Sequence, residues 1–576
     1  MAGVAAFVRK VPAGDITAWT SPRGCTTTRI AGGTTGPNVV LLDGTGNHPR
    51  EILGNKGHTI DAMRRHGFPV PPAFCLTTEV GVRYLAEPEP TMAAIWDDVL
   101  DRISWLEAET ARTFGGASRP LLVSVRSGAT QSMPGMMDTI LDLGINDAVE
   151  QALAEQSSLE FARDTRRRFT RMYRRVVAGD QASEASVPAD PYAQLRAGIE
   201  AVFTSWNSPR AIAYRDHYGL DDRGGTAVVV QAMVFGNQSA NSGAGVLSSR
   251  NPITGAREPF GEWLAGGQGD DVVSGLVDVA PIAALRDEQP TVYDELTAAA
   301  RRWEQLTSDV QEIEFTVEDG NLWLLQARAA ARSAQAAVRI ALQLRHERRI
   351  DELETLRRVT PAHIEALLMP ALQPETRLAA TLLAKGLPAC PGVASGRAYA
   401  DVDEAIDAAD RGEQVILVRD HTRPEDVSGM LAARAIVTEV GGAASHAAVV
   451  SRELGRVAVV GCGHNVAESL AGKHITVDGC TGEVRAGELE LSAWSENGTP
   501  ELRELADIAL RASPLRVHAA GDYPRLDDHS QAAVRAALAA GKSDVVSARP
   551  LVTMLVAAHL ADDDTTPLRP DPSATK

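Results

Sequence analysis

One segment, residues 434–455, constrains the fold more than any other, because it prescribes a strand, a turn and a helix in succession. Its apolar run RAIVTEV favours a buried β-strand, and a Gly-Gly dipeptide ends that run. Ser445 is a good N-cap for a helix whose apolar positions share one face, and Gly455 suits the helix end. The segment therefore predicts a strand-turn-helix unit with a histidine, His446, in the first turn of the helix.

The position of His446 suits phosphoryl transfer. The positive end of the helix dipole disfavours an imidazolium, so we expect a neutral, nucleophilic ring near pH 7. The free backbone N–H groups at that helix end would also stabilise a phosphoryl group carried on the ring. Taken alone, however, the motif favours a simpler interpretation, a histidine that only begins a helix.

Two further segments offer contacts to phosphate groups. The strand LLVSVRS (121–127) runs into a Ser- and Gly-rich loop, and Arg126 at its end is a bidentate donor. Lys56 stands beside a glycine at the mouth of a helix and predicts a phosphate clamp. The alternatives are an ordinary surface loop and one of the many exposed lysines that proteins carry.

The segment QEIEFTVEDGNLWLLQAR (311–328) predicts a β-hairpin that carries a cation site. Its alternation places Glu312 and Glu314 on the same face of one strand. Two adjacent carboxylates repel unless a cation lies between them, and hard oxygen ligands suit Mg²⁺. The turn returns the chain to Gln326 and Arg328, close to that pair. Two exposed carboxylates at a strand edge are the alternative.

Two more segments bear on the binding of a nucleotide or a nucleic acid. The buried-looking strand TAVVVQAMVFG (226–236) places Gln231 and Met233 where they could border a base. A Gly-rich loop follows it, which alone is weak evidence. The arginines at positions 166–168, 171, 174 and 175 are interpreted as a solvated helix face, because the acidity of the chain conflicts with nucleic-acid binding.

Composition narrows the class of protein. The formal net charge of −18 repels nucleic acids and anionic membranes, so an anionic substrate needs a local cationic cluster. Five cysteines are scattered without a C-x-x-C pair, which predicts neither a disulfide framework nor a zinc module. No apolar stretch is long enough for a membrane helix. We therefore expect a cytoplasmic protein with neither nucleic-acid nor membrane partners.

The pattern of strands and helices predicts an α/β and α+β multidomain chain. Residues 1–45 lack periodicity and predict a flexible extension, and residues 46–332 alternate strands and helices. Residues 333–384 have the composition of a helical linker. A second α/β unit is expected over 385–489, and a short α/β remnant with a disordered tail over 490–576.

Five segments, in this order, resemble those of pyruvate, phosphate dikinases and extend over about residues 51–489. They are SVRSGATQSMPGMMDTILDLGIN, FGNQSANSGAGVLSSRNPITG, QEIEFTVEDGNLWLLQAR, KGLPACPGVASG and GGAASHAAVVSRELG. The resemblance implies that residues 46–332 form an ATP-grasp-like nucleotide-binding domain. It also implies that residues 385–489 form a swivelling β/β/α phosphohistidine domain.

The resemblance implies a reaction and its residues. In that family ATP phosphorylates the histidine, inorganic phosphate takes the γ-phosphoryl group, and AMP and pyrophosphate leave. The histidine then passes its phosphoryl group to pyruvate, which gives phosphoenolpyruvate. By resemblance His446 carries the phosphoryl group, Glu312 and Glu314 hold Mg²⁺, and six residues bind the nucleotide or its phosphates: Lys56, Arg126, Gln231, Met233, Gln326 and Arg328.

The sequence departs from the family at three places. Ala444 stands where a regulatory threonine is usual, and Glu312 stands where an aspartate is usual. The residues after 489 are fewer than the roughly 250 of the family's pyruvate-binding barrel. We therefore expect transfer to pyruvate to need a separate barrel-bearing partner. The resemblance also allows a homodimer.

Two other functions stay open. Rifampicin phosphotransferase shares both domain types, but its large acceptor domain between them has no counterpart in the short segment 333–384. A non-catalytic nucleotide-binding regulatory protein is the other alternative, and the presence of Lys56, Arg126, Glu314 and His446 argues against it. AMP formation from ATP separates this alternative from both enzymes.

Overall fold

The structure, a computed structural model, describes residues 37–131, 133, 135–178, 187–220, 224–274, 277–368, 371–372, 374–489, 491–492, 499–526 and 528–563. Every element below belongs to one compact unit that begins at Asn38. Most of the expected N-terminal extension, residues 1–36, and the expected tail, residues 564–576, lie outside the described residues. Within the described part, no helix combines the length and the apolar character needed to cross a membrane.

The first sheet has the strand order β1-β2-β7-β5-β6, and all its pairs are antiparallel. Its strands are β1 (Val39–Leu41), β2 (Ala73–Leu76), β5 (Val123–Gly128), β6 (Thr139–Leu143) and β7 (Ala227–Ala232). One face packs on α2 (Thr78–Ala86), α3 (Pro88–Thr110), α4 (Asp147–Gln156), α5 (Leu159–Tyr173) and α6 (Pro191–Thr204). The other face packs on α1 (Arg50–Arg65), so β7 is buried along its whole length. β1 begins inside the segment that was expected to be an extension.

The second sheet, also antiparallel, has the order β10-β9-β8-β11-β12. Its strands are β8 (Gly243–Ser248), β9 (Phe260–Ala265), β10 (Ala280–Pro281), β11 (Gln311–Glu318) and β12 (Asn321–Ala329). The same core contains residues of α1, α9 (Ala283–Glu288) and α10 (Pro290–Thr307). Glu312 pairs with Arg328 and Glu314 with Gln326, as the predicted hairpin required.

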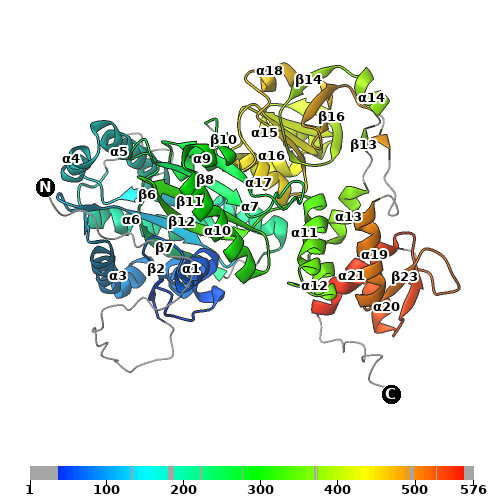
Figure 1. Cartoon of the computed structure of the whole chain (residues 1–576), viewed down its shortest axis with the longest axis horizontal. Coiled ribbons are helices and arrows are strands. Elements are labelled where there is room, and N and C mark those ends of the chain that lie inside the picture. The colour runs from blue at the N-terminus through cyan, green and yellow to red at the C-terminus, as the bar shows by residue number, and fades with distance from the viewer. Residues whose placement is uncertain are drawn as a thin grey trace. The chain divides into compact units, whose positions relative to one another are not determined.

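The third sheet has the order β14-β21-β20-β16-β17-β18-β19-β15. The pairs from β16 to β19 are parallel and the remaining pairs antiparallel. Its strands are β14 (Leu382–Lys385), β15 (Leu387–Cys390), β16 (Val393–Tyr399), β17 (Val415–Arg419), β18 (Ala435–Thr438), β19 (Val457–Val460), β20 (His474–Asp478) and β21 (Glu483–Ala486). Helices α15 (Val402–Asp410), α16 (Val427–Ala432) and α17 (His446–Glu453) lie against it (Figure 1).

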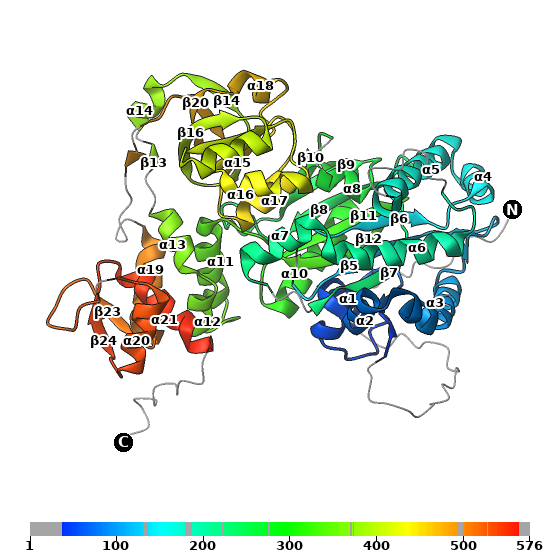
Figure 2. The same ribbon diagram turned by 180° about the vertical axis from the view of Figure 1, so that it is seen from behind.

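The helices expected as a linker share a hydrophobic core with the C-terminal elements (Figure 2). They are α11 (Ala334–His346), α12 (Glu352–Arg357) and α13 (Pro361–Leu367). Their partners are α19 (Pro500–Ala512), α20 (Gln531–Ala539), α21 (Pro550–Asp563) and the parallel strands β23 (Arg516–His518) and β24 (Asp544–Val546). The sequence indicated helices in both segments but not this shared core, because its contacts join residues far apart in the chain.

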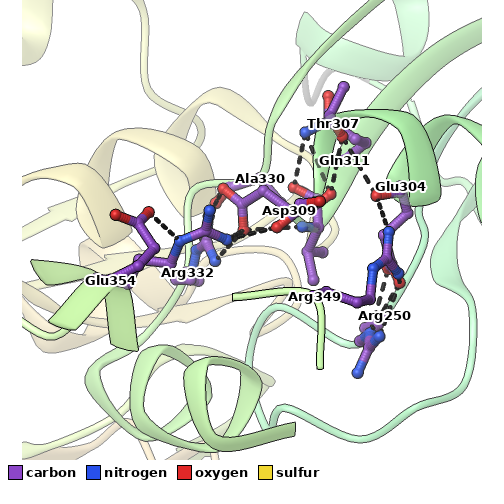
Figure 3. A network of polar contacts seen from close by, with 12 residues as sticks. Arg250, Glu304, Thr307, Asp309, Gln311, Ala330, Arg332, Arg349 and Glu354 are labelled. Carbon is purple, nitrogen blue, oxygen red and sulfur yellow. Dashed lines mark hydrogen bonds and ion pairs between the residues drawn. The ribbon is translucent and has the colours of Figure 1, made fainter. Parts of the chain in front are cut away.

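A network of ion pairs joins α11 and the segment after it to the second sheet (Figure 3). The Arg250 guanidinium lies 2.8 Å from Glu304 of α10 and 2.8 Å from Glu347. Arg349 also reaches Glu304, at 3.1 Å, and Arg332 reaches Asp309 at 2.7 Å. Arg250 and Glu304 are almost fully buried, so their charges need the compensation that these ion pairs provide.

Candidate active site

A cavity of about 880 Å³ opens between the two antiparallel sheets and the N-terminal end of α17. Strands β5, β7, β11 and β12, the start of α1 and residues 421–425 after β17 contribute to its lining. All but one of the predicted site residues line it: Lys56, Arg126, Gln231, Met233, Glu314, Gln326, Arg328 and His446. The exception, Glu312, bonds to Arg328, which does line the cavity.

Lys56 reaches the cavity because α1 is broken just before it. Gly54 has a left-handed backbone (φ 66), and a Cβ there would lie 1.6 Å from the carbonyl oxygen of Gly128. The Lys56 ammonium donates to the carbonyl of Ser127 at 2.8 Å. Burial, and then the charge of Arg126, lower the pKa of Lys56 to about 7. The lysine thus changes charge readily near neutral pH.

Arg126 and the hairpin residues form a connected set. Arg126 donates to Gln231 at 3.3 Å and to Glu314 at 3.1 Å. The amide nitrogen of Gln326 donates to the second oxygen of Glu314. The amide oxygen of Gln326 is buried and, among the described residues, has no hydrogen-bond partner. An oxygen ligand is therefore left free beside a carboxylate.

The two carboxylates of β11 each face a different arginine. Arg328 donates to Glu312 from Nε at 2.8 Å and from Nη2 at 2.6 Å. Burial acts to lower the pKa of Arg328, but Glu312 and Glu314 outweigh it and raise that pKa. The repulsion that the sequence predicted between Glu312 and Glu314 is thus relieved by one arginine partner for each carboxylate.

His446 is the first residue of α17, and Ser445 caps the helix by accepting from the N–H of Ala448 at 3.4 Å. The imidazole Nδ1 lies 3.0 Å from the hydroxyl of Thr422. Nε2 is buried without a hydrogen-bond partner in the described part of the chain, beside Gly135. With its proton on Nδ1, the ring keeps the Nε2 lone pair free.

The neutrality of His446 has a different main cause from the one predicted. Burial lowers its pKa to about 4, against the opposing charges of Asp426 and Glu425. The sequence suggested the helix dipole as the cause, because it could not show that residues distant in the chain would cover the ring. The outcome, a neutral imidazole near pH 7, is the same.

Two residues that the sequence analysis missed hold the loop before His446. Glu262 of β9 accepts from the N–H of Ala444 at 3.0 Å. A Cβ on Gly442 would lie 2.0 Å from the Glu262 carboxylate, so the second glycine of the pair leaves room for that group. Arg452 of α17 is buried and donates to the carbonyls of Ala443, Ala331 and Ala389. Neither role has a local sequence signal.

The arginines of α5 are not all solvated, contrary to the sequence interpretation. Arg168 is mostly buried and pairs with Asp164 at 2.6 Å and Asp271 at 2.7 Å. Arg171, Arg174 and Arg175 are exposed, as the sequence interpretation had it, although Arg171 and Arg175 also line the cavity. The helical period alone could not show that this face of α5 meets the cavity, because the facing loops come from elsewhere in the chain.

Two family models match the chain. The AMP/ATP-binding domain of pyruvate phosphate dikinase matches residues 91–293, and the mobile domain of PEP-utilising enzymes matches residues 412–482. The first match contains β5, β7, β8 and β9, and the second contains α17 with His446. Each match thus contains part of the cavity lining, although Lys56 and the residues of the hairpin lie outside both.

The chain is similar to curated pyruvate, phosphate dikinases. It is 38% identical to that of Clostridium symbiosum over 510 residues, which are 78% of this chain and 58% of that protein. It is 38% identical to pyruvate, phosphate dikinase 2 of Oryza sativa subsp. japonica over 82% of this chain and 59% of that protein. It is 39% identical to the pyruvate, phosphate dikinase of Rhizobium meliloti (strain 1021) over 77% of this chain and 56% of that protein.

The chain thus spans less than two thirds of the length of these relatives. Over the part that it spans, the nucleotide-binding and mobile domains occur in the order of those proteins. In that part, the chain carries the AMP/ATP-binding domain and the mobile domain of the pyruvate, phosphate dikinases to which it is similar.

Proposed function

We propose that this chain catalyses the nucleotide half-reaction of a dikinase, in which ATP and inorganic phosphate phosphorylate His446 and release AMP and pyrophosphate. The observation that carries the proposal is the Nε2 of a neutral imidazole, which has no partner among the described residues and shares one cavity with Lys56, Arg126 and Arg328. A nucleophile and the cations that would bind its phosphoryl donor thus share one chamber.

The half-reaction forms one bond to His446. The Nε2 lone pair attacks the β-phosphorus of ATP, and the bond from that phosphorus to the oxygen of AMP breaks. Inorganic phosphate then takes the γ-phosphoryl group as pyrophosphate, and His446 keeps the β-phosphoryl group. Phosphoryl transfer of this kind depends on positioning and on neutralised charge.

Each side chain has a distinct part in this proposal. Thr422 orients the ring through Nδ1, which leaves Nε2 to attack. Arg126 and Arg328 bind phosphate oxygens in a fixed planar geometry, while Lys56 supplies a point charge. Gln231 and Met233, on the buried strand β7 and just after it, border the base.

The hairpin residues fit a magnesium ion. The amide oxygen of Gln326, which has no partner in the part of the chain that the structure describes, lies beside the Glu314 carboxylate. Glu312 adds a second carboxylate on the same strand face. These are the hard oxygen donors that Mg²⁺ takes together with substrate phosphates. When bound, Mg²⁺ neutralises charge on the phosphates. Glu312, Glu314 and Gln326 are the residues that would hold it.

We further propose pyruvate as the final acceptor, bound at a second site. This rests on the printed names of the relatives, which are pyruvate, phosphate dikinases. The swivelling domain would carry the phosphoryl group between the two sites.

Isotope exchange tests the half-reaction without an acceptor. Protein incubated with ATP, Mg²⁺, phosphate, pyrophosphate and labelled AMP should move label from AMP into ATP, because the half-reaction is reversible. His446→Ala should abolish the exchange. His464→Ala, which changes an exposed histidine of the same domain, should retain it. Exchange in His446→Ala at the wild-type rate would contradict the proposal.

A further inference from the structure

Asp142 stands at an irregularity in β6. The register between β5 and β6 shifts there, so that one residue of β5, Ser124, faces two residues of β6, Leu141 and Asp142. Asp142 takes up the extra length with a left-handed backbone (φ 62), which is uncommon for a residue other than glycine. A β-bulge of this kind turns a side chain away from the direction that strand alternation would give it. The irregularity thus sets the direction of the Asp142 carboxyl.

The carboxyl of Asp142 is buried in a place that gives it no donor. Asp142 is fully buried, and neither of its carboxyl oxygens has a hydrogen-bond partner among the described residues. An ionised carboxylate only accepts hydrogen bonds, so it is costly to bury where no donor reaches it. Burial first, and then the charge of Asp270, raise the pKa of Asp142 well above its ordinary value. A neutral carboxyl, with one O–H group to donate, fits this place better.

The charged groups that act on Asp142 come from two helices. α5 contributes Asp164 and Arg168, and α8 (Gly269–Ser274) contributes Asp270. The Arg168 guanidinium lies 2.6 Å from Asp164, 2.7 Å from Asp271 and 3.6 Å from Asp270. One cation therefore already faces three carboxylates before Asp142 is counted. A proton on Asp142 avoids adding a fourth negative charge.

Asp270 is the partner that such a proton fits. Its Oδ1 is buried and has no hydrogen-bond partner in the part of the chain that the structure describes, because Arg168 lies beyond hydrogen-bond length. Burial, and then Asp271, raise the pKa of Asp270 against the opposing charges of Arg168 and Arg171. Both oxygens of Asp164, by contrast, already accept from arginines of α5. Oδ1 of Asp270 is thus the acceptor that a donor from Asp142 would satisfy.

Asp142 and Asp270 come from two different parts of the cavity wall. β6 belongs to the first sheet, and its residues Thr139 and Leu141 line the cavity. α8 lines the cavity through Asp270 and Val273, and it packs on β8, β9 and β11 of the second sheet. A hydrogen bond between the two carboxyl groups would therefore hold α8 against β6 at the wall of the cavity.

We propose that Asp142 is a positioning residue, whose carboxyl keeps its proton and donates it to Oδ1 of Asp270, and that this bond fixes α8 at the cavity wall. Asp142 acts through Asp270 and does not touch the reacting atoms. The proposal rests on the proposed function only for the ligand of the cavity, ATP. The proton itself is a property of the free chain.

Infrared difference spectroscopy on the full chain tests the proton. Near pH 7, the spectrum of wild type minus that of D142N should contain the C=O band of a protonated carboxyl. The control Asp147→Asn changes a carboxylate whose side chain is 98% exposed, and it should leave that band in place. A difference spectrum that contains carboxylate bands in place of the protonated band would overturn the proposal.

The pH dependence of stability gives a second measurement. In the unfolded chain Asp142 ionises at its ordinary pKa, whereas in the folded chain it stays protonated, so wild type loses stability as pH rises above that value. In urea unfolding, the ratio of the unfolding constant of wild type to that of D142N should increase by up to about tenfold per pH unit from about pH 5 to about pH 7. A constant ratio over this range would contradict the proposal.

ATP affinity tests the positioning role. D142N keeps a neutral N–H donor for Asp270, whereas D142A removes the donor and leaves a buried oxygen unsatisfied. The Kd for ATP should stay within about twofold of wild type in D142N and increase at least about fivefold in D142A. Equal Kd values in the two variants would overturn the positioning role.

These measurements separate the proposal from the proposed function, because none of them requires phosphorylation of His446. Wild type that shows the protonated band but never labels His446 would sink the half-reaction and keep the bond between Asp142 and Asp270. Wild type that labels His446 but lacks the protonated band would overturn that bond and keep the half-reaction.

Discussion

At the scale of single residues, burial sets the chemistry of the cavity. It holds His446 neutral, with a pKa of about 4, and brings the pKa of Lys56 to about 7. The nucleophile therefore keeps its charge state over the physiological range, while Lys56 does not. The pH dependence of nucleotide binding should accordingly come from Lys56.

We predict that ATP affinity falls as pH rises above about 7. Bound phosphates favour the protonated lysine and raise its pKa, so binding takes up a proton wherever the free lysine is neutral. The Kd should increase by up to about tenfold per pH unit from pH 7 to 9. In Lys56→Met, binding should be weaker and lose this dependence, and in Lys473→Met, an exposed control, it should be retained. Calorimetric titration at several pH values measures this, and an unaltered pH dependence in Lys56→Met would refute it.

The sequence predicted which residues lie together near the cavity, but not which contacts orient each side chain and shift its pKa. The alternation of β11 and β12 was enough to place Glu312 beside Arg328 and Glu314 beside Gln326. Glu262 and Arg452 were missed, because their partners are backbone groups of segments that only the tertiary fold brings near. A periodic pattern carries no information on such contacts.

At the scale of elements, the break in α1 places Lys56. A residue with a Cβ at position 54 would meet the Gly128 carbonyl at 1.6 Å and would also be strained by the positive φ. The break itself was not predicted, because an isolated glycine within a helical pattern does not reveal its φ. The cap of α17 at Ser445 was predicted, since capping is a local interaction.

Gly54→Ala should therefore be far more damaging than the same change at Gly67. Gly67 also has a positive φ, but nothing lies within 4 Å of its added Cβ, so the change should cost only about 1 to 2 kcal/mol of strain. At Gly54 a main-chain clash adds to that strain and displaces Lys56. Urea unfolding and ATP binding measure both effects. Equal losses of stability in the two variants, with ATP binding intact, would show that the break is dispensable.

At the scale of the whole molecule, buried ion pairs connect the second sheet to the helices that follow it. Glu304 compensates both Arg250 and Arg349, and all three side chains are buried or nearly so (Figure 3). The arrangement was not predictable from sequence. Arg250 and Glu304 lie in the expected domain 46–332, whereas Glu347 and Arg349 lie in the expected linker 333–384. Loss of the Glu304 carboxylate would leave Arg250 and Arg349 without the anion that they share.

We predict that Glu304→Ala lowers the free energy of unfolding by about 3 to 5 kcal/mol, the usual cost of breaking a buried pair. Glu501→Ala is the matched control, because it breaks an ion pair with Arg339 in which both side chains are about a third exposed. That change should cost about 0 to 1 kcal/mol. Chemical denaturation compares the two variants. Similar losses of unfolding free energy would mean that the buried network does not stabilise the contact between the second sheet and the helices that follow it.

One measurement tests the phosphohistidine mechanism most directly. The chain is incubated with Mg²⁺, phosphate and ATP labelled at the β-phosphoryl group, and protein-bound label is assayed for acid lability and base stability. Label on wild type and on His464→Ala, but not on His446→Ala, is the predicted result. Absence of label on wild type that still binds ATP would contradict the mechanism and favour a regulatory nucleotide-binding protein.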